Sequence, residues 1–139
     1  MASITEIRTF LLGFEGVTVH EATPDYFFFP GAEQKFPFAT IVTHDDPHDS
    51  ASALDREGLF RLNMPTDKAT FGELFPAISS RRDLEAAVFD HRAIDTLFPH
   101  PVYGRMRWVS VINPERTWAQ CRGLLEAARQ LRELRPDSW

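Results

Sequence analysis

The chain has 139 residues but a single cysteine, Cys121, so no internal disulfide can form. This count excludes a disulfide-stapled secreted fold and a zinc or iron–sulfur site built from several cysteines, and it favours a reducing compartment. Cys121 falls on the apolar stripe of a predicted helix, where we expect it to pack as a small buried side chain.

Long apolar runs are also absent, because no stretch approaches the roughly 18 residues that a membrane-spanning helix needs. The first fifteen residues include Glu6, Arg8 and Glu15, so they lack the uncharged core of a signal peptide. The chain has no Gly-rich phosphate loop, no Gly-x-Ser-x-Gly elbow and no dinucleotide fingerprint. We therefore expect a cytoplasmic protein without membrane contact or cofactor, and we assign no catalytic residue.

Basic side chains are in the minority: 15 Lys and Arg face 20 Asp and Glu, which gives a formal net charge of −5. Nucleic-acid binding is not expected, because it needs a basic surface that neutralises phosphates. The balance differs along the chain, since residues 101–139 hold 7 of the 15 basic and only 4 of the 20 acidic side chains. This asymmetry predicts two differently charged faces of one domain, with Arg105, Arg107 and Arg116 as candidates for a basic stripe.

The spacing of apolar residues predicts helices at both ends of the chain. Ser3 begins a capping box ahead of a helix over about 3–13, and Thr117 begins another ahead of the longest helix, which runs to about 134. Strands are predicted at 17–21, 26–29, 38–43, 59–64 and 107–112, and short helices at 65–75, 83–89 and 92–97. Together these elements predict an α+β fold: one two-layer domain over residues 1–139, with a largely antiparallel sheet of about five strands and the N- and C-terminal helices packed on one face.

The strand at 59–64 has two chemically different faces, because side chains alternate along a strand. Phe60, Leu62 and Met64 share one face, which we expect the terminal helices to cover. Arg61 and Asn63 share the other face, which we expect to be partly open. Arg61 would there pair with a carboxylate such as Asp55 or bind an anionic ligand.

A second candidate feature is the loop at 99–104. Two prolines fix the backbone around His100, and Tyr103 follows three residues later. A rigid loop that presents an imidazole and a phenol suits the rim of a ligand site, although both rings could instead fill space at the edge of the sheet. The candidate ligand-binding residues are Arg61, Asn63, His100, Tyr103 and Trp108.

The loop between the third and fourth predicted strands is rich in metal-ligating side chains. It holds two imidazoles and three carboxylates in six residues: His44, Asp45, Asp46, His48 and Asp49. Nitrogen and oxygen ligands at this density could hold a divalent metal, with His91 and His100 as further ligands. The loop lacks the glycine and the terminal glutamate of a calcium loop, and a solvated loop with Asx turns explains the same residues.

The chain contains three runs, FPFATIVT (36–43), LDREGLFRLN (54–63) and LFPHPVYG (97–104), that resemble an uncharacterised bacterial domain-of-unknown-function family. That resemblance implies no activity. At the level of the fold, the His-Pro and Tyr loop, the Trp-Val-Ser-Val strand and the final helix are similar to the C-terminal half of MmcQ/YjbR-like proteins, which implies a frataxin-like sheet with flanking helices. The DNA binding and iron binding of those groups do not carry over, because this chain is acidic and its acids cluster in a loop.

These observations favour a non-enzymatic binding module for a small anionic ligand or a protein partner. The alternative is a metal-binding protein or metal-assisted hydrolase that uses the histidines and aspartates. A metal site requires at least three of these side chains to converge, whereas a binding module requires a concave pocket at the candidate ligand-binding residues. The sequence does not indicate the oligomeric state.

Overall fold

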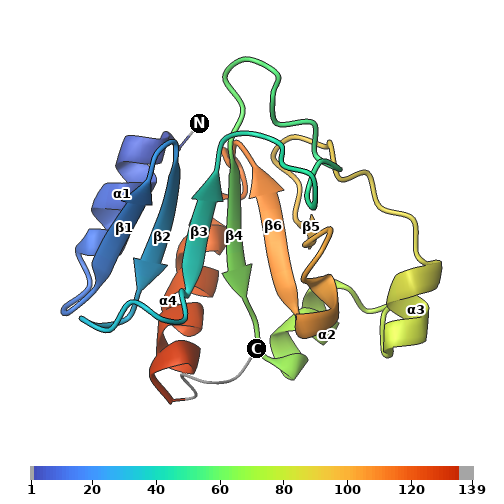
Figure 1. Ribbon diagram of the computed structural model, residues 1–139. Helices are drawn as coiled ribbons and strands as arrows, with labels where there is room; N and C mark the ends of the chain where they lie inside the picture. Colours follow the sequence, from blue (N-terminus) through green and yellow to red (C-terminus); the bar gives the residue numbers. More distant parts are fainter. Residues whose placement is uncertain (1, 135–139) are drawn as a thin grey trace.

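The computed structural model describes residues 2–134, which form an antiparallel sheet with long helices against one face (Figure 1). Within these residues the strands are β1 (Thr18–Ala22), β2 (Asp25–Phe29), β3 (Ala39–Val42), β4 (Arg61–Pro65), β5 (Phe98–Pro99) and β6 (Trp108–Ile112). The helices are α1 (Ile4–Leu12), α2 (Lys68–Leu74), α3 (Arg81–Ala86), the 3-10 turn η1 (Gly104–Met106) and α4 (Trp118–Leu134). The strand order is β1-β2-β3-β4-β6-β5, and every neighbouring pair is antiparallel. The predicted α+β class is therefore confirmed.

The two terminal helices begin in different ways. The Ser3 hydroxyl accepts the Glu6 N–H at 3.1 Å and caps α1, as the capping box predicts. The cap of α4 differs from the prediction, because the Thr117 hydroxyl donates to Asp95 at 2.6 Å. Asp95 also accepts the backbone N–H groups of residues 115–117, so a distant carboxylate stabilises the start of this helix.

The region before the 99–104 loop departs from the prediction. No helix forms at 92–97, because Ile94 bridges to Ile112 beside the sheet and Asp95 takes a left-handed conformation with φ of 55°. Phe98 and Pro99 then form β5, which the sequence did not predict and which pairs with β6. Proline is tolerated there because β5 lies at the end of the strand order.

The core lies between the sheet and the helices α1 and α4, which both cross behind it in Figure 1. Leu62 and Met64 of β4 are fully buried in this core, and Phe60 is almost so. The expectation that the terminal helices cover this face is therefore correct. The cluster also includes Ile7 and Leu11 of α1, Val109 and Val111 of β6, and Cys121 and Leu125 of α4.

The opposite face of the sheet, which we call the outer face, is not open at its centre. Arg61 is 0% exposed and Asn63 is 1% exposed. Residues 43–58, which we call the covering segment, supply Asp49 and the buried Ser52 directly to Arg61. The predicted exposure of Arg61 and Asn63 is wrong, because an irregular segment without a helix seals this part of the sheet.

Replacement of Met64 by alanine tests the position of the core. We expect Met64→Ala to lower the free energy of unfolding by about 2–5 kcal/mol, because it leaves a cavity among fully packed side chains. Val88→Ala is the control, since Val88 is 97% exposed and its truncation should change stability by less than about 0.5 kcal/mol. Urea unfolding followed by circular dichroism measures both values, and equal losses would contradict the assignment of the core.

Candidate functional site

Arg61 projects from β4 onto the outer face and meets its partners there. Its Nε donates to Asn63 Oδ1 at 2.8 Å, and its Nη1 donates to Asp49 Oδ1 at 2.9 Å and to Ser52 Oγ at 3.0 Å. Nη2 donates to the second oxygen of Asp49, which completes a bidentate ion pair, and lies 3.2 Å from His100 Nε2. Because these groups surround the guanidinium, Arg61 is not available to bind an external anion.

The partner of Arg61 differs from the one that the sequence suggested. Asp49 forms the ion pair, whereas Asp55 accepts the backbone N–H of Asp45 at 3.0 Å. The Arg61 guanidinium opposes the effect of burial on Asp49, and the pKa of this carboxyl lies below its ordinary value of 3.8. Asp49 is therefore ionised at neutral pH and anchors the covering segment to the sheet.

His100 connects this ion pair to the turn that follows β5. Its Nδ1 accepts the backbone N–H groups of Val102 and Tyr103, each at 3.0 Å. Its Nε2 lies 3.2 Å from the donor Nη2 of Arg61 and 3.8 Å from the acceptor Oδ2 of Asp49. Burial, and then the positive charge of Arg61, lower the pKa of His100 to about 3. The imidazole is therefore neutral, and it fixes the backbone of the turn.

A cavity of about 390 Å³, the outer cavity, lies on the outer face beside the covering segment. Four of the five candidate ligand-binding residues line it: Asn63, His100, Tyr103 and Trp108. The carboxylates of Asp25, Asp46 and Asp49 line the same space, and Lys and Arg side chains are absent from its described lining. These charges do not suit the small anion that we expected at this surface, and the role of the four residues remains a prediction.

Four of the five side chains in the predicted metal loop have structural partners, among them Asp49, which pairs with Arg61. His44 Nδ1 lies 3.2 Å from Asp25, the Asp45 carboxylate accepts the Leu54 N–H, and Asp46 accepts the His48 N–H. Within residues 2–134, no three His, Cys, Asp or Glu side chains converge in a metal-binding group. The metal alternative remains a prediction that this geometry does not support.

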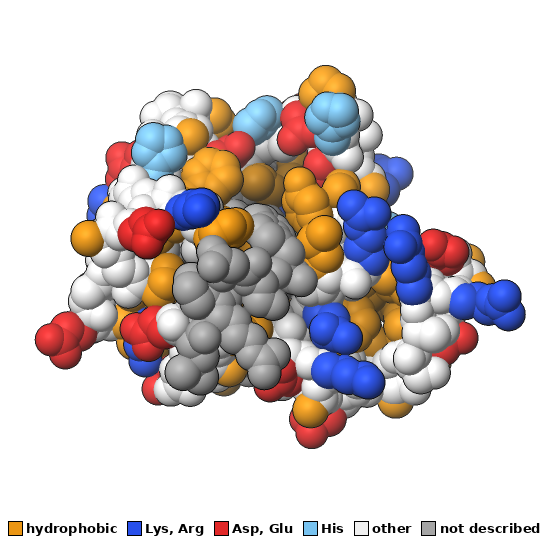
Figure 2. Space-filling view, turned by 60° about the horizontal axis from the view of Figure 1, so that its bottom comes forward, with side chains coloured by type: hydrophobic (Ala, Val, Ile, Leu, Met, Phe, Trp, Pro, Cys, Tyr) orange, Lys and Arg blue, Asp and Glu red, His pale blue; other side chains and the backbone are white. Residues whose placement is uncertain are grey.

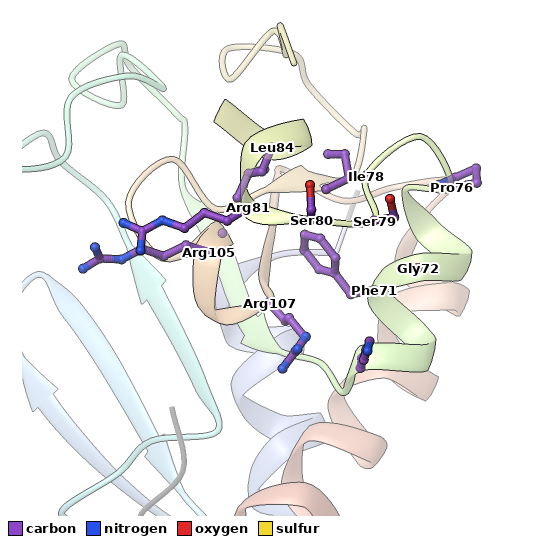
Figure 3. Close-up of a pocket in the computed structure, with 12 residues that line it drawn as sticks. Phe71, Gly72, Pro76, Ile78, Ser79, Ser80, Arg81, Leu84, Arg105 and Arg107 are labelled. Carbon is purple, nitrogen blue, oxygen red and sulfur yellow. The ribbon is translucent and has the colours of Figure 1, made fainter. Parts of the chain in front are cut away.

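A second cavity, of about 420 Å³, lies at the edge of the sheet where β4 ends and β6 begins. Figure 2 shows Lys and Arg side chains gathered around a hydrophobic hollow. We call this space the basic cavity, and its cationic lining consists of Lys68, Arg81, Arg105 and Arg107. Its apolar lining includes Phe71, Ile78 and Leu84, and Figure 3 shows these side chains between α2, α3 and the turn at η1.

The topology explains why these cations meet. Pro65, the last residue of β4, pairs with Trp108, the first residue of β6, so the residues beyond these two ends share one edge of the sheet. Lys68 follows β4 at the start of α2, and Arg107 immediately precedes β6. The Thr66 N–H and hydroxyl donate to the Arg107 carbonyl at 3.0 and 2.7 Å, which ties the two connections together.

The cations of the basic cavity have few internal partners. Lys68, Arg105 and Arg107 are exposed, and their side chains form no hydrogen bond or ion pair within the described residues 2–134. Arg81 has one acidic neighbour, Glu85, at 3.3 Å, and both side chains of this pair are largely exposed. A pair of this kind contributes little to stability, so the cavity keeps a strongly positive rim.

The basic cavity was only partly visible in the sequence. Arg105 and Arg107 were candidates for a basic stripe, but Arg116 belongs elsewhere, since its guanidinium lies 3.4 Å from Asp95. Lys68 and Arg81 gave no local signal, because each lies in the first turn of a short helix far from the arginines in sequence. The strand register was needed to bring the four together.

Comparisons with known proteins place the whole described region in one family. A family model described as a family of unknown function (DUF6194) matches residues 2–137. The searches of curated proteins and of solved structures found no match. The family match confirms the resemblance to an uncharacterised domain, whereas the resemblance to MmcQ/YjbR-like proteins stays a prediction. No helix within residues 2–134 is long and apolar enough to cross a membrane.

The burial of neutral His100 predicts a loss of stability in mild acid. The ordinary pKa of histidine is 6.5, whereas the pKa of His100 in the folded protein is about 3. Between these two pH values His100 binds a proton in the unfolded chain but not in the folded protein. Acidification through this range therefore favours unfolding. In His100→Asn the amide oxygen can still accept the two turn N–H groups, and we expect the fall in unfolding free energy between about pH 6.5 and 4 to be smaller than in the wild type.

Urea unfolding over a pH series measures this effect. His20→Asn is the matched control, because it makes the same change at an exposed position of β1. We expect it to keep the pH dependence of the wild type. An unchanged pH dependence in His100→Asn would show that His100 is not held neutral by the fold.

Proposed function

The chain belongs to DUF6194, a family of unknown function, and we propose that it is a binding protein for a small organic anion, which it holds unchanged in the basic cavity. One observation carries this proposal. Three exposed cationic side chains, Lys68, Arg105 and Arg107, surround a single cavity without an ion pair among the described residues. The expectation of an anionic ligand is thus kept, but its site moves from Arg61 to the edge of the sheet.

The charge of the whole chain makes this cluster informative. With a formal net charge of −5, the protein has carboxylates enough to neutralise a few surface cations. The described acids beside the rim have partners of their own, because Glu85 pairs with Arg81 and the Asp83 carboxylate accepts the N–H and hydroxyl of Ser79. Like charges that share a surface repel each other, and a bound anion removes this repulsion. Guanidinium groups also suit phosphate and carboxylate, because their N–H groups can donate two parallel hydrogen bonds.

The apolar lining indicates that the ligand is more than an inorganic ion. Phe71 and Ile78 are buried on the wall of the cavity, and Leu84 is partly buried. A volume of about 420 Å³ lies within the range of roughly 300–1,000 Å³ that holds small organic ligands. The lining therefore favours a molecule with an apolar portion beside its negative charge.

The backbone at Arg107 supports a functional role for this residue. Arg107 has φ of 66°, a left-handed conformation that is unfavourable for residues other than glycine and asparagine. Its N–H donates to the Gly104 carbonyl at 2.9 Å, and its own carbonyl accepts two hydrogen bonds from Thr66. These bonds hold the conformation, and Figure 3 shows the Arg107 side chain at the cavity.

Binding of phenyl phosphate tests the proposal. This probe combines an anionic group with a small apolar ring, and two-dimensional NMR titration measures its affinity. We expect Arg105→Gln to weaken binding by about 10-fold or more, because hydrogen bonds to charged groups contribute roughly 1.5–3 kcal/mol. Arg122→Gln makes the same charge change at an exposed position of α4, and it should change the affinity less than about 2-fold.

A steric variant removes the site without removing charge. Gly72 lines the basic cavity, and a Cβ at this position would meet nothing within 4 Å. Gly72→Leu should therefore keep the fold, since leucine also favours a helix by up to about 1 kcal/mol relative to glycine, and it should abolish binding of the probe. Equal loss in Arg105→Gln and Arg122→Gln, or full binding in Gly72→Leu, would contradict the proposed site.

A further inference from the structure

The basic cavity lies beside a second, smaller cavity and shares part of its lining with it. This side cavity has a volume of about 230 Å³ and shares Arg81, Leu84, Gly104 and Arg105 with the basic cavity. The shared residues are the boundary between the two spaces. Arg81 comes from α3 and Arg105 from η1, and Figure 3 shows the two side chains extending in the same direction. A ligand that occupies both spaces lies along a boundary that includes both arginines.

The side cavity itself is suited to an uncharged group. Phe89, Pro99 and Pro101 contribute apolar surface to it. Its cations are the two shared arginines, and it also contains the carboxylate of Glu85. A second negative charge in this space would meet a cation, Arg81, that is already paired with Glu85, whereas an aromatic or aliphatic group needs no counter-charge.

The basic cavity also has room for an apolar group. Its volume of about 420 Å³ far exceeds that of a single phosphate, and Phe71 and Ile78 are part of its wall. Apolar surface therefore lies on both sides of the Arg81 and Arg105 pair. Lys68 and Arg107 line the basic cavity but not the side cavity, so four Lys and Arg side chains line the first space and two line the second.

We infer that the ligand carries its negative charge in the middle of the molecule, as a small organic phosphodiester with an aromatic or apolar arm on each side. This inference rests on the proposed function and specifies its ligand class. The phosphodiester lies against Arg81 and Arg105, one arm enters the basic cavity, and the other enters the side cavity. A phosphate monoester offers only one arm and leaves one of the two apolar spaces empty.

Two probes that differ by one arm test this inference. Phenyl phosphate has a single ring and a terminal phosphate, and diphenyl phosphate has two rings and a smaller negative charge. We expect the wild-type protein to bind diphenyl phosphate about 10-fold more tightly than phenyl phosphate, because burial of a second ring outweighs the lost charge. In NMR titrations, diphenyl phosphate should shift amide signals of residues 85–102 as well as 68–81, and phenyl phosphate mainly the latter.

A variant that fills the side cavity provides the second part of the experiment. Ala87 lines the side cavity, and Ala87→Phe should remove the preference for diphenyl phosphate while changing the affinity for phenyl phosphate less than about 2-fold. Ala86→Phe is the matched control, because Ala86 is exposed at the adjacent position and does not line the cavity. It should keep the preference of the wild type. Circular dichroism verifies that both variants fold, and the wild-type comparison of the two probes needs no variant.

The outcomes separate this inference from the proposed function. If phenyl phosphate binds with the expected dependence on Arg105 but diphenyl phosphate binds no better, the internal-charge inference is wrong and the proposed function stands. If neither probe binds the wild type, both are wrong. If a ten-residue oligothymidine binds far more tightly than diphenyl phosphate, with a steep salt dependence, the ligand is a nucleic acid and the small-molecule inference is overturned.

Discussion

The buried ion pair between Arg61 and Asp49 is the interaction on which the outer half of this protein depends. A guanidinium without exposed surface is strongly destabilising unless its N–H groups and its charge are matched. Asp49 supplies the charge and two acceptor oxygens, while Asn63 and Ser52 accept two further N–H groups. The covering segment is therefore held in a defined position on the sheet, because its Asp49 carboxylate neutralises the buried Arg61 guanidinium.

The same ion pair organises the turn that supplies two of the four cationic side chains of the basic cavity, Arg105 and Arg107. His100 lies against the Arg61 guanidinium on one side of its ring and accepts two turn N–H groups on the other. Its carbonyl accepts the Gly104 N–H at 2.9 Å, which leads directly into η1 and to Arg105 and Arg107. Two positive regions therefore have opposite roles: the buried arginine holds the fold together, and the exposed cations face a cavity.

The sequence predicted the features that depend on local periodicity. The alternation over residues 60–64 correctly separated Phe60, Leu62 and Met64 from Arg61 and Asn63, and the apolar stripe of α4 correctly placed Cys121 in the core. Features that depend on distant pairing were missed. Asp49 and Asp55 both lie within twelve residues of Arg61 and have the same side chain, so only the path of the covering segment decides which one pairs. The meeting of Lys68 with Arg107 likewise required the register between Pro65 and Trp108.

A double-mutant cycle on Arg61 and Asp49 tests the central claim most directly. The free energy of unfolding is measured for the wild type, Arg61→Met, Asp49→Ala and the double variant. Each single change leaves a charge buried or poorly matched, and each should lower stability by about 3–5 kcal/mol. The double variant should lose no more than either single variant, because it removes both charges together. Additive losses would contradict the account, since they would mean that the two side chains contribute to the fold independently.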